Sequence, residues 1–259
     1  MNSKFYRNYS TKKDIDLSNI SQILEGEGEE ITKDKEKESL AKISNLNKNA
    51  QPIKRTKSNH PLLLTDYLKE ALIGLTLGDL SLEKSSKNSN VRLRFDQSIV
   101  HSSYLNFLYD KFKEYTLTPP KFTISKPDKR TGQIYYSLIF KTRLLPCFNY
   151  LWDLFYKEGK KIIPSNIKDL LTEVGLAYWI MNNRGLGKRG VLNLNTGSYT
   201  EIEIELLMSA LTQKFNLKCR KSLNRSNQCI IVIPKSQVNQ VADLTYKHFH
   251  PSMYYKIGR

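Results

Sequence analysis

The chain contains the same order of predicted elements twice, and this internal repeat constrains its fold more than any other feature. The first copy is predicted to hold a helix over 65–79, a strand over 91–97, a helix over 100–115, a hairpin over 121–141 and a helix over 144–157. The second is predicted to hold a helix over 173–183, a strand over 190–196, a helix over 200–215, a hairpin over 218–234 and a helix over 235–247. Two such copies in one chain predict a pseudo-two-fold arrangement.

The strand predictions depend on alternation between apolar and polar residues, which is the period of a half-buried strand. Residues 91–97 place Val91, Leu93 and Phe95 on one face and charged residues on the other. Residues 190–196 alternate in the same way. Thr200 is a plausible N-cap for the helix that follows, because its hydroxyl can accept from a free backbone N–H. The mixture of strands and helices predicts an α+β fold.

The charge of the chain indicates a polyanionic partner. Its 259 residues carry 41 Lys and Arg against 25 Asp and Glu, a net charge of +16. Residues 1–60 hold only 12 of those cations and 9 of those acids, so most of the excess lies in the folded part. A basic surface of this kind favours nucleic acid, and the simpler alternative is a solubilising surface.

Residues 1–60 are poor in large apolar residues and are interpreted as a leader or linker, before a first repeat over 61–165 and a second over 166–259. The basic, acid-free start of the chain resembles a mitochondrial presequence, although a disordered tail explains it equally well. Three unpaired cysteines indicate a reducing compartment. No apolar run of membrane-spanning length occurs, so no membrane partner is expected.

The two copies of the first helix end in different residues at the same offset. Leu72–Asp79 ends in an acid, whereas Leu176–Asn183 ends in an amide. Gly74 and Gly78 share one face of the first helix, and small residues on such a face allow two helices to approach closely. Ala177 and Met181 occupy the corresponding spacing in the second helix. A close approach is therefore expected to bring Asp79 and Asn183 together.

A pair of carboxylates at that position holds divalent cations, because hard ions such as Mg²⁺ prefer oxygen ligands. Such ions support phosphodiester cleavage by stabilising the attacking and leaving oxygens. A carboxylate facing the Asn183 amide is expected to hold them less well. Taken alone, an Asp after a helix is more often a turn or capping residue, and the repeat is what favours the metal-binding interpretation of Asp79. His248 and His250 share one face of an extended segment, but no third ligand lies near them in sequence.

The predicted strands and hairpins supply a set of candidate contacts to DNA. Lys and Arg suit phosphates and guanine, and Asn and Gln pair with adenine. A solvated strand face explains any single member of the set equally well. The candidates are Arg92, Arg94, Gln97, Lys126, Arg130, Tyr135, Lys141, Asn193, Asn195, Arg220, Lys221 and Arg225.

The paired helices resemble the double signature of the LAGLIDADG homing endonucleases. Further similar segments are Thr118–Pro120, Phe155–Pro164, Leu192–Thr196 and His250–Lys256, so the resemblance covers about residues 61–259. It implies two αββαββα units that present a saddle of β-sheet to DNA. It also implies a monomer, encoded in a mitochondrial intron, that cuts a long asymmetric double-stranded DNA site with Mg²⁺.

The resemblance assigns roles by position. The two catalytic acids fall on Asp79 and Asn183, and one lysine per repeat falls on Lys161 and Lys256. The metal ligands fall on Asp79, Gly78 and Asn182. A lysine at such a site stabilises phosphate charge or polarises water, although Lys161 is also explained as an ordinary surface charge.

The second copy departs from the family pattern at Asn183 and at Arg184, which stands where a glycine is usual. Asn183 removes one ligand charge and Arg184 adds positive charge, so both oppose cation binding. Cleavage is therefore expected to be weak or confined to nicking one strand. A second hypothesis is an RNA maturase that binds its own group I intron RNA without cutting DNA. A third is a decaying reading frame, against which the intact core patterns argue.

Overall fold

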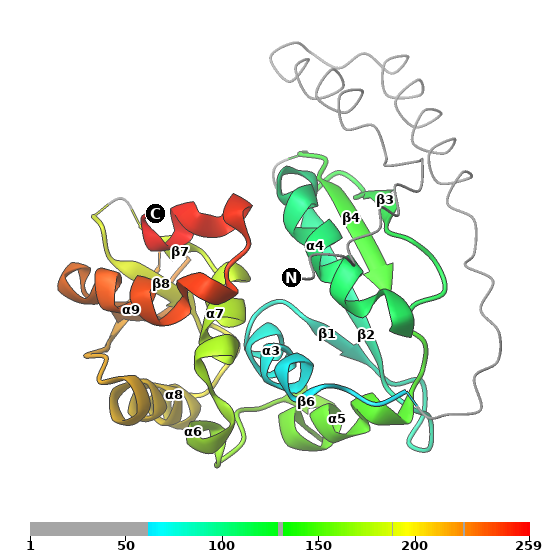
Figure 1. Cartoon of the computed structure of the whole chain (residues 1–259), viewed down its shortest axis with the longest axis horizontal. Helices are drawn as coiled ribbons and strands as arrows, with labels where there is room; N and C mark the ends of the chain where they lie inside the picture. The colour runs from blue at the N-terminus through cyan, green and yellow to red at the C-terminus, as the bar shows by residue number, and fades with distance from the viewer. Residues whose placement is uncertain (1–61, 129–131, 188, 225) are drawn as a thin grey trace, which may run out of the picture. The chain divides into compact units, whose positions relative to one another are not determined.

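The computed structural model describes residues 62–128, 132–187, 189–224 and 226–259, and Figure 1 shows how their elements are arranged. The expected leader or linker over 1–60 lies outside the described residues, as do Arg130 and Arg225. The described residues belong to one compact unit, Pro52–Arg259. None of the described helices combines the length and apolar character needed to span a bilayer.

The first half of the described chain builds a four-stranded antiparallel sheet in the order β1-β2-β4-β3. Its elements are α3 (Asp66–Leu77), β1 (Ser81–Glu83), β2 (Arg92–Ser98), α4 (Ser102–Phe112), β3 (Lys121–Ile124), β4 (Tyr136–Lys141) and α5 (Asn149–Phe155). Helix α4 packs on one face of this sheet, where the rings of Phe112 and Phe95 lie 5.1 Å apart. The other face carries the charged residues of β2 and β4.

The second half repeats this order and builds a sheet in the order β7-β8-β10-β9. Its elements are α7 (Glu173–Met181), β7 (Gly185–Leu186), β8 (Leu192–Asn195), α8 (Glu201–Phe215), β9 (Arg220–Leu223), β10 (Cys229–Ile233) and α9 (Val238–Thr245). A 3₁₀ helix, η6 (Pro251–Ile257), follows. Each half therefore reads helix, two strands, helix, two strands, helix, which is the αββαββα order.

A short connection joins the two halves. It consists of a two-stranded hairpin of β5 (Tyr156–Lys157) and β6 (Lys160–Lys161), then α6 (Ile167–Leu170). Glu203 in α8 accepts a hydrogen bond from the Ile163 backbone N–H at 3.0 Å, so the connection is attached to the second half. This attachment fixes the position of Lys161, which lies two residues before Ile163.

Helices α3 and α7 lie side by side at the centre of the described unit (Figure 1). A Cβ added to Gly74 would lie 1.9 Å from the Gly175 carbonyl oxygen and 2.9 Å from the Trp179 backbone nitrogen. The two backbones thus approach as the glycine spacing predicts. The partner on α7, however, is Gly175, not the face of Ala177 and Met181, which are buried elsewhere in the core.

Capping explains where the helices begin. The Thr65 hydroxyl accepts from the Leu68 N–H at the start of α3. Thr200 forms a capping box with Glu203 at the start of α8, as the sequence predicts. The short strands β1 and β7 were not expected, because two or three residues carry too little alternation to register as a strand.

Candidate functional site

The ends of α3 and α7 place the expected site residues next to each other. Gly78 and Asp79 directly follow α3, while Asn182 and Asn183 directly follow α7. A Cβ added to Gly78 would lie 2.6 Å from the Asn182 Cβ, so the two helix ends touch. The close approach at Gly74 therefore continues to the ends of the helices and places Asp79 beside the second copy.

Asp79 is exposed and makes no hydrogen bond or ion pair with any described residue. It lines a small pocket together with Leu75, Leu80, Phe95, Asp96, Gln97, Leu108 and Asn182. Burial against the pocket desolvates the Asp79 carboxylate and raises its pKa, and the charge of Asp96 raises it further. The positive charges of Lys161 and Lys256 oppose it. Asp79 is thus an unpartnered carboxylate within the field of two lysines.

Each of the two expected lysines donates hydrogen bonds to backbone carbonyl oxygens at one helix end. Lys161 Nζ donates to the Gly78 carbonyl oxygen at 3.1 Å. Lys256 Nζ donates to the carbonyl oxygens of Met181 and Asn183, at 2.5 and 2.6 Å. Desolvation lowers the pKa of each lysine to about 8, although the charge of Asp79 favours their protonated forms. Both ammonium groups can therefore exchange a proton near neutral pH.

Asn183 is only 7% exposed, and its amide is already engaged. Its Oδ1 accepts a hydrogen bond from the Asn195 backbone N–H in β8 at 2.5 Å. The side chain is neutral and faces the edge of the second sheet. The two helix ends therefore differ in charge, as the sequence predicts, and also in availability, which the sequence does not show.

Asn182, an expected metal ligand, is held by a network that sequence reasoning missed. Gln97 Nε2 donates to its Oδ1 at 3.0 Å, and its Nδ2 donates to the Tyr104 hydroxyl at 2.8 Å and to the Tyr178 carbonyl at 2.9 Å. These bonds use both Nδ2 hydrogens and one lone pair of Oδ1, so the Asn182 side chain is less available to a cation than a free carboxylate. The network instead fixes the second helix end against β2 and α4.

Arg184 follows the second helix end, where the sequence analysis expected it to oppose a cation. Its side chain is exposed, and the charges that shift the pKa of Asp79 come from Lys161, Lys256 and Asp96, without Arg184 among them. The neighbouring Gly185 matters more, because it has φ +68° and a Cβ there would lie 2.5 Å from the Lys256 Cβ. Because glycine has no side chain, the buried aliphatic part of Lys256 can pack directly against residue 185.

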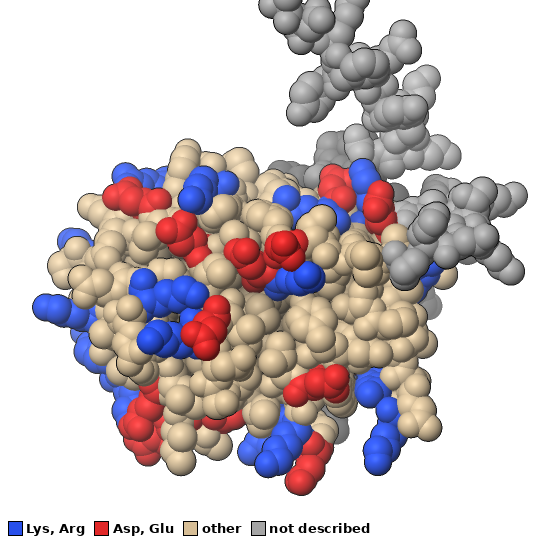
Figure 2. Space-filling view, turned by 60° about the horizontal axis from the view of Figure 1, so that its bottom comes forward, with Lys and Arg blue, Asp and Glu red and all other residues tan. Residues whose placement is uncertain are grey.

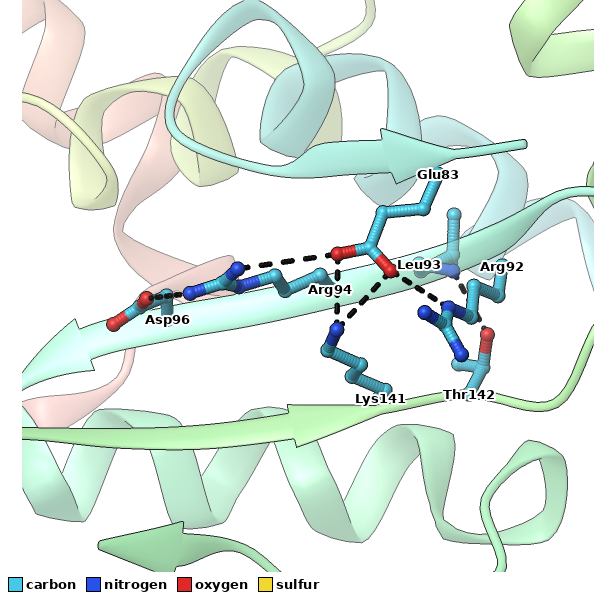
Figure 3. Close-up of polar contacts among 7 residues, drawn as sticks. All are labelled: Glu83, Arg92, Leu93, Arg94, Asp96, Lys141 and Thr142. Carbon is cyan, nitrogen blue, oxygen red and sulfur yellow. Dashed lines mark hydrogen bonds and ion pairs between the residues drawn. The ribbon is translucent and has the colours of Figure 1, made fainter. Parts of the chain in front are cut away.

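Three of the candidate DNA contacts gather on the polar face of the first sheet. Arg92 and Arg94 share this face of β2, and Lys141 lies directly opposite Arg94 on β4. Glu83 in β1, which the sequence analysis did not single out, lies among them (Figure 3). Gln97 is paired with Leu138 and faces the helices instead, because side chains alternate along a strand.

The second sheet carries amides where the first carries charges. Asn193, Asn195 and Arg220 share one face, as the pairing of Val232 with Asn193 and Arg220 shows. Lys221 lies on the opposite face, where it forms ion pairs with Glu201 and Glu205 of α8. Adjacent strand residues point to opposite sides, so Lys221 lies away from the face that carries Arg220 and the two candidates are not brought together.

Lys126 and Tyr135 are exposed and lie in the connection between β3 and β4. Figure 2 shows Lys and Arg interspersed with Asp and Glu over the face in view. No group of three metal-binding His, Cys, Asp or Glu side chains occurs among the described residues. His250 Nδ1 instead lies 2.8 Å from the Ser252 hydroxyl at the start of η6.

Comparison with known proteins identifies the family. Residues 69–241 match the profile of the LAGLIDADG DNA endonuclease family. A probable intron-encoded endonuclease 1 of Wickerhamomyces canadensis is 30% identical over 201 residues, which cover 75% of this chain and 85% of that protein. The chain belongs to the LAGLIDADG DNA endonuclease family, whose members are metal-dependent, and it has the α+β homing endonuclease fold.

Two further relatives differ in what they are named for. The homing endonuclease I-WcaI, solved bound to its DNA recognition sequence, aligns with a TM-score of 0.69 and 29% identity, over 76% of this chain and 88% of that one. A cytochrome b mRNA maturase bI2 of Debaryomyces hansenii is 30% identical over 199 residues, 75% of each protein. Chains similar to this one therefore include both a protein solved on its DNA recognition sequence and a protein named as an mRNA maturase.

Proposed function

We propose that this chain is a monomeric homing endonuclease that binds a long, asymmetric double-stranded DNA site and hydrolyses phosphodiester bonds weakly, with Mg²⁺. The observation that carries the proposal is the position of Asp79. This carboxylate lies free at the paired helix ends, where Lys161 of the connection and Lys256 of the second half both act on it. Membership of the endonuclease family supports the same conclusion.

The unlike sheets support an asymmetric target. The first sheet offers Arg92, Arg94 and Lys141, which suit phosphates and guanine. The second offers Asn193 and Asn195, which suit adenine. Two sheets with different chemistry read two different half-sites, so a palindromic target is not expected. Exposed Lys126 and Tyr135 extend the contact surface of the first sheet.

The residues at the first helix end fit a divalent cation. Asp79 has no hydrogen-bond donor from any described residue, and a free carboxylate is a preferred ligand of Mg²⁺. The Asn182 carbonyl oxygen lies at the same helix ends, whereas the Gly78 carbonyl oxygen there already accepts a hydrogen bond from Lys161 Nζ. A bound cation would neutralise charge on the phosphate. Asn183 fits less well, because its amide is neutral and already accepts from Asn195.

The protein's own groups support cleavage in two ways. Lys161 Nζ and Lys256 Nζ are held near the helix ends, where their charges stabilise an incoming phosphate and the negative charge that develops on it. Because the pKa of each is about 8, a minority of either amine is neutral near pH 7 and can accept a proton from water. The charge of Asp79 stabilises the ammonium forms, while backbone carbonyl groups hold the two side chains in place.

Cleavage is weak in this proposal because the site is short of negative charge. Two lysines face one unpartnered carboxylate, where two carboxylates would balance them. Loss of one ligand charge weakens cation binding on the side of Asn183. The expected result is slow cutting, or nicking of one strand.

A second candidate function is an RNA maturase that assists splicing of its own group I intron. The engaged Asn183 amide favours this alternative, since a chain retained for binding needs no second acid. The resemblance to cytochrome b mRNA maturases from two yeasts supports it too, and it supports an origin in a mitochondrial intron. The described sheets and their basic residues serve either function.

The test uses a supercoiled plasmid that carries the intronless host gene, with Mg²⁺ and the wild-type chain. Slow nicking or cutting at one site is expected, and Asp79→Asn should abolish it while DNA binding remains. Asp243→Asn is the control, because Asp243 pairs only with Arg259 on the surface. No binding to the gene would contradict the endonuclease proposal, and accelerated splicing of the intron RNA would then support the maturase.

A further inference from the structure

Glu83 lies at the centre of the basic cluster on the first sheet, which consists of Arg92, Arg94 and Lys141 (Figure 3). Its Oε2 is 2.6 Å from Arg92 Nε, and Lys141 Nζ lies 3.1 Å from both of its oxygens. Arg94 Nη1 lies 3.9 Å from Oε1. One carboxylate therefore meets every cation of the cluster.

The strand register explains this arrangement. Glu83 is directly opposite Arg92, and Arg94 is directly opposite Lys141. Without an acid nearby, the cross-strand pair of like charges would repel and the long side chains would disperse into solvent. Hydrogen bonds from Lys141 and Arg92 lower the pKa of Glu83 more than its partial burial raises it, so the acid is ionised at neutral pH.

The same three cations are the strongest phosphate-binding candidates on this face. Any phosphate that approaches them competes with Glu83 for their N–H groups. A sequence-specific complex can exploit cations held in fixed orientations, whereas loose binding to arbitrary DNA must first break the internal ion pairs. The Glu83 carboxylate thus weakens non-specific binding of DNA phosphates more than it weakens sequence-specific binding.

We propose that Glu83 is a specificity-determining residue: an internal counter-anion that positions Arg92, Arg94 and Lys141 and suppresses binding to non-target DNA. The inference rests on the proposed DNA-binding function and deepens it. Its effect belongs to the half-site under the first sheet, because the strands of the second sheet contain no acidic residue. Arg94 keeps a second partner, Asp96, at 2.8 Å, so Glu83 mainly controls Arg92 and Lys141.

The experiment measures binding of a random-sequence DNA duplex to wild type and to Glu83→Gln, between about 50 and 200 mM salt. Each phosphate that is neutralised adds about 0.9 to the slope of log K against log salt. Freeing Arg92 and Lys141 should steepen the slope of Glu83→Gln by roughly one to two, with tighter binding at low salt. Glu83→Asp should restore most of the wild-type slope.

Glu201→Gln is the matched control. It makes the same change in net charge and also removes one carboxylate from a lysine, but that lysine, Lys221, faces α8. Its slope should equal that of the wild type. An unchanged or shallower slope in Glu83→Gln would overturn the inference, as would an equal change in both variants. If the wild type fails to bind any duplex at low salt, the proposed function itself fails.

Discussion

Gly74 in α3 lies against the backbone of Gly175 in α7, so close that an added Cβ would lie 1.9 Å from the Gly175 carbonyl oxygen. This contact brings together the helix ends that carry Asp79 and Asn183. It joins the two halves of the chain through backbone atoms, which cannot move aside as a flexible side chain does.

Replacing Gly74 by alanine should therefore separate the helices and destabilise the fold by about 2–4 kcal/mol, at or above the usual cost of overpacking a core. Chemical denaturation measures the loss. Gly175→Ala is the control, because its Cβ would meet Leu171 Cδ1 at 3.2 Å and Glu70 O at 3.3 Å, which is tight but tolerable. Equal stability losses in the two variants would contradict the proposed contact.

Thr76 in α3 is fully buried, and its hydroxyl has no hydrogen-bond partner among the described residues. Thr76→Val keeps the shape and removes an unsatisfied polar group, so it should stabilise the chain by about 1 kcal/mol. Thr142→Val is the matched control and should destabilise it, because the Thr142 hydroxyl accepts from the Leu93 N–H at 2.9 Å (Figure 3). Melting temperatures that move in the same direction for both variants would argue against this difference.

The two lysines predict how stability depends on pH. Desolvation lowers the folded-state pKa of Lys161 and Lys256 to about 8, below the value of about 10.4 for an unfolded lysine. Below pH 8 both lysines are protonated in the folded and in the unfolded chain, so the folded state bears the full cost of burying two charged amines. Between about pH 8 and 10 the unfolded state binds more protons, so stability should rise with pH by about 1–3 kcal/mol per lysine.

Urea denaturation at a series of pH values tests this rise. Lys256→Met should remove part of it, because Lys256 is only 5% exposed and carries one of the two shifts. Lys247→Met serves as the control, since Lys247 is an exposed partner of Glu173. A Lys256→Met variant whose stability changes from pH 8 to 10 by the same amount as that of the wild type would show that the Lys256 amine is not desolvated.

Asn183→Asp should make stability depend on Mg²⁺. Without the ion, a second carboxylate near Asp79 repels it and lowers the melting temperature. A cation bound only by the folded state raises it again, by RT ln(1 + [L]/Kd). The wild type should show a smaller rise with Mg²⁺, and Asp243→Asn should match the wild type. Equal shifts in wild type and Asn183→Asp would mean that residue 183 is not near the cation.

The sequence predicted the repeated order of elements because long apolar helices and alternating strands have strong periods. The N-caps Thr65 and Thr200 were predictable for the same local reason. Glu83 was not, since β1 has only three residues and its importance comes from partners on β2 and β4. The face of Lys221 depends on where the hairpin register begins, which the sequence of β9 leaves open.

At the site, the types and positions of the residues were predictable from the sequence, but the hydrogen bonds that their side chains make were not. The asymmetry between Asp79 and Asn183 is visible in the sequence alone. The bond from the Asn195 backbone to the Asn183 amide depends on how α7 packs beside β8 within the second half. The Gln97–Asn182–Tyr104 network depends on tertiary contacts between the two halves. Gly175 was missed because its role depends on the crossing point of the helices.

The central claim is that the second helix end limits cleavage because Asn183 is neutral and engaged. The most direct measurement compares Mg²⁺-dependent cleavage of the intronless host gene by wild type and by Asn183→Asp. We predict that the wild type only nicks the plasmid or linearises it slowly, while Asn183→Asp converts it rapidly to the linear form. Equal rates of linearisation by the two proteins would contradict the claim.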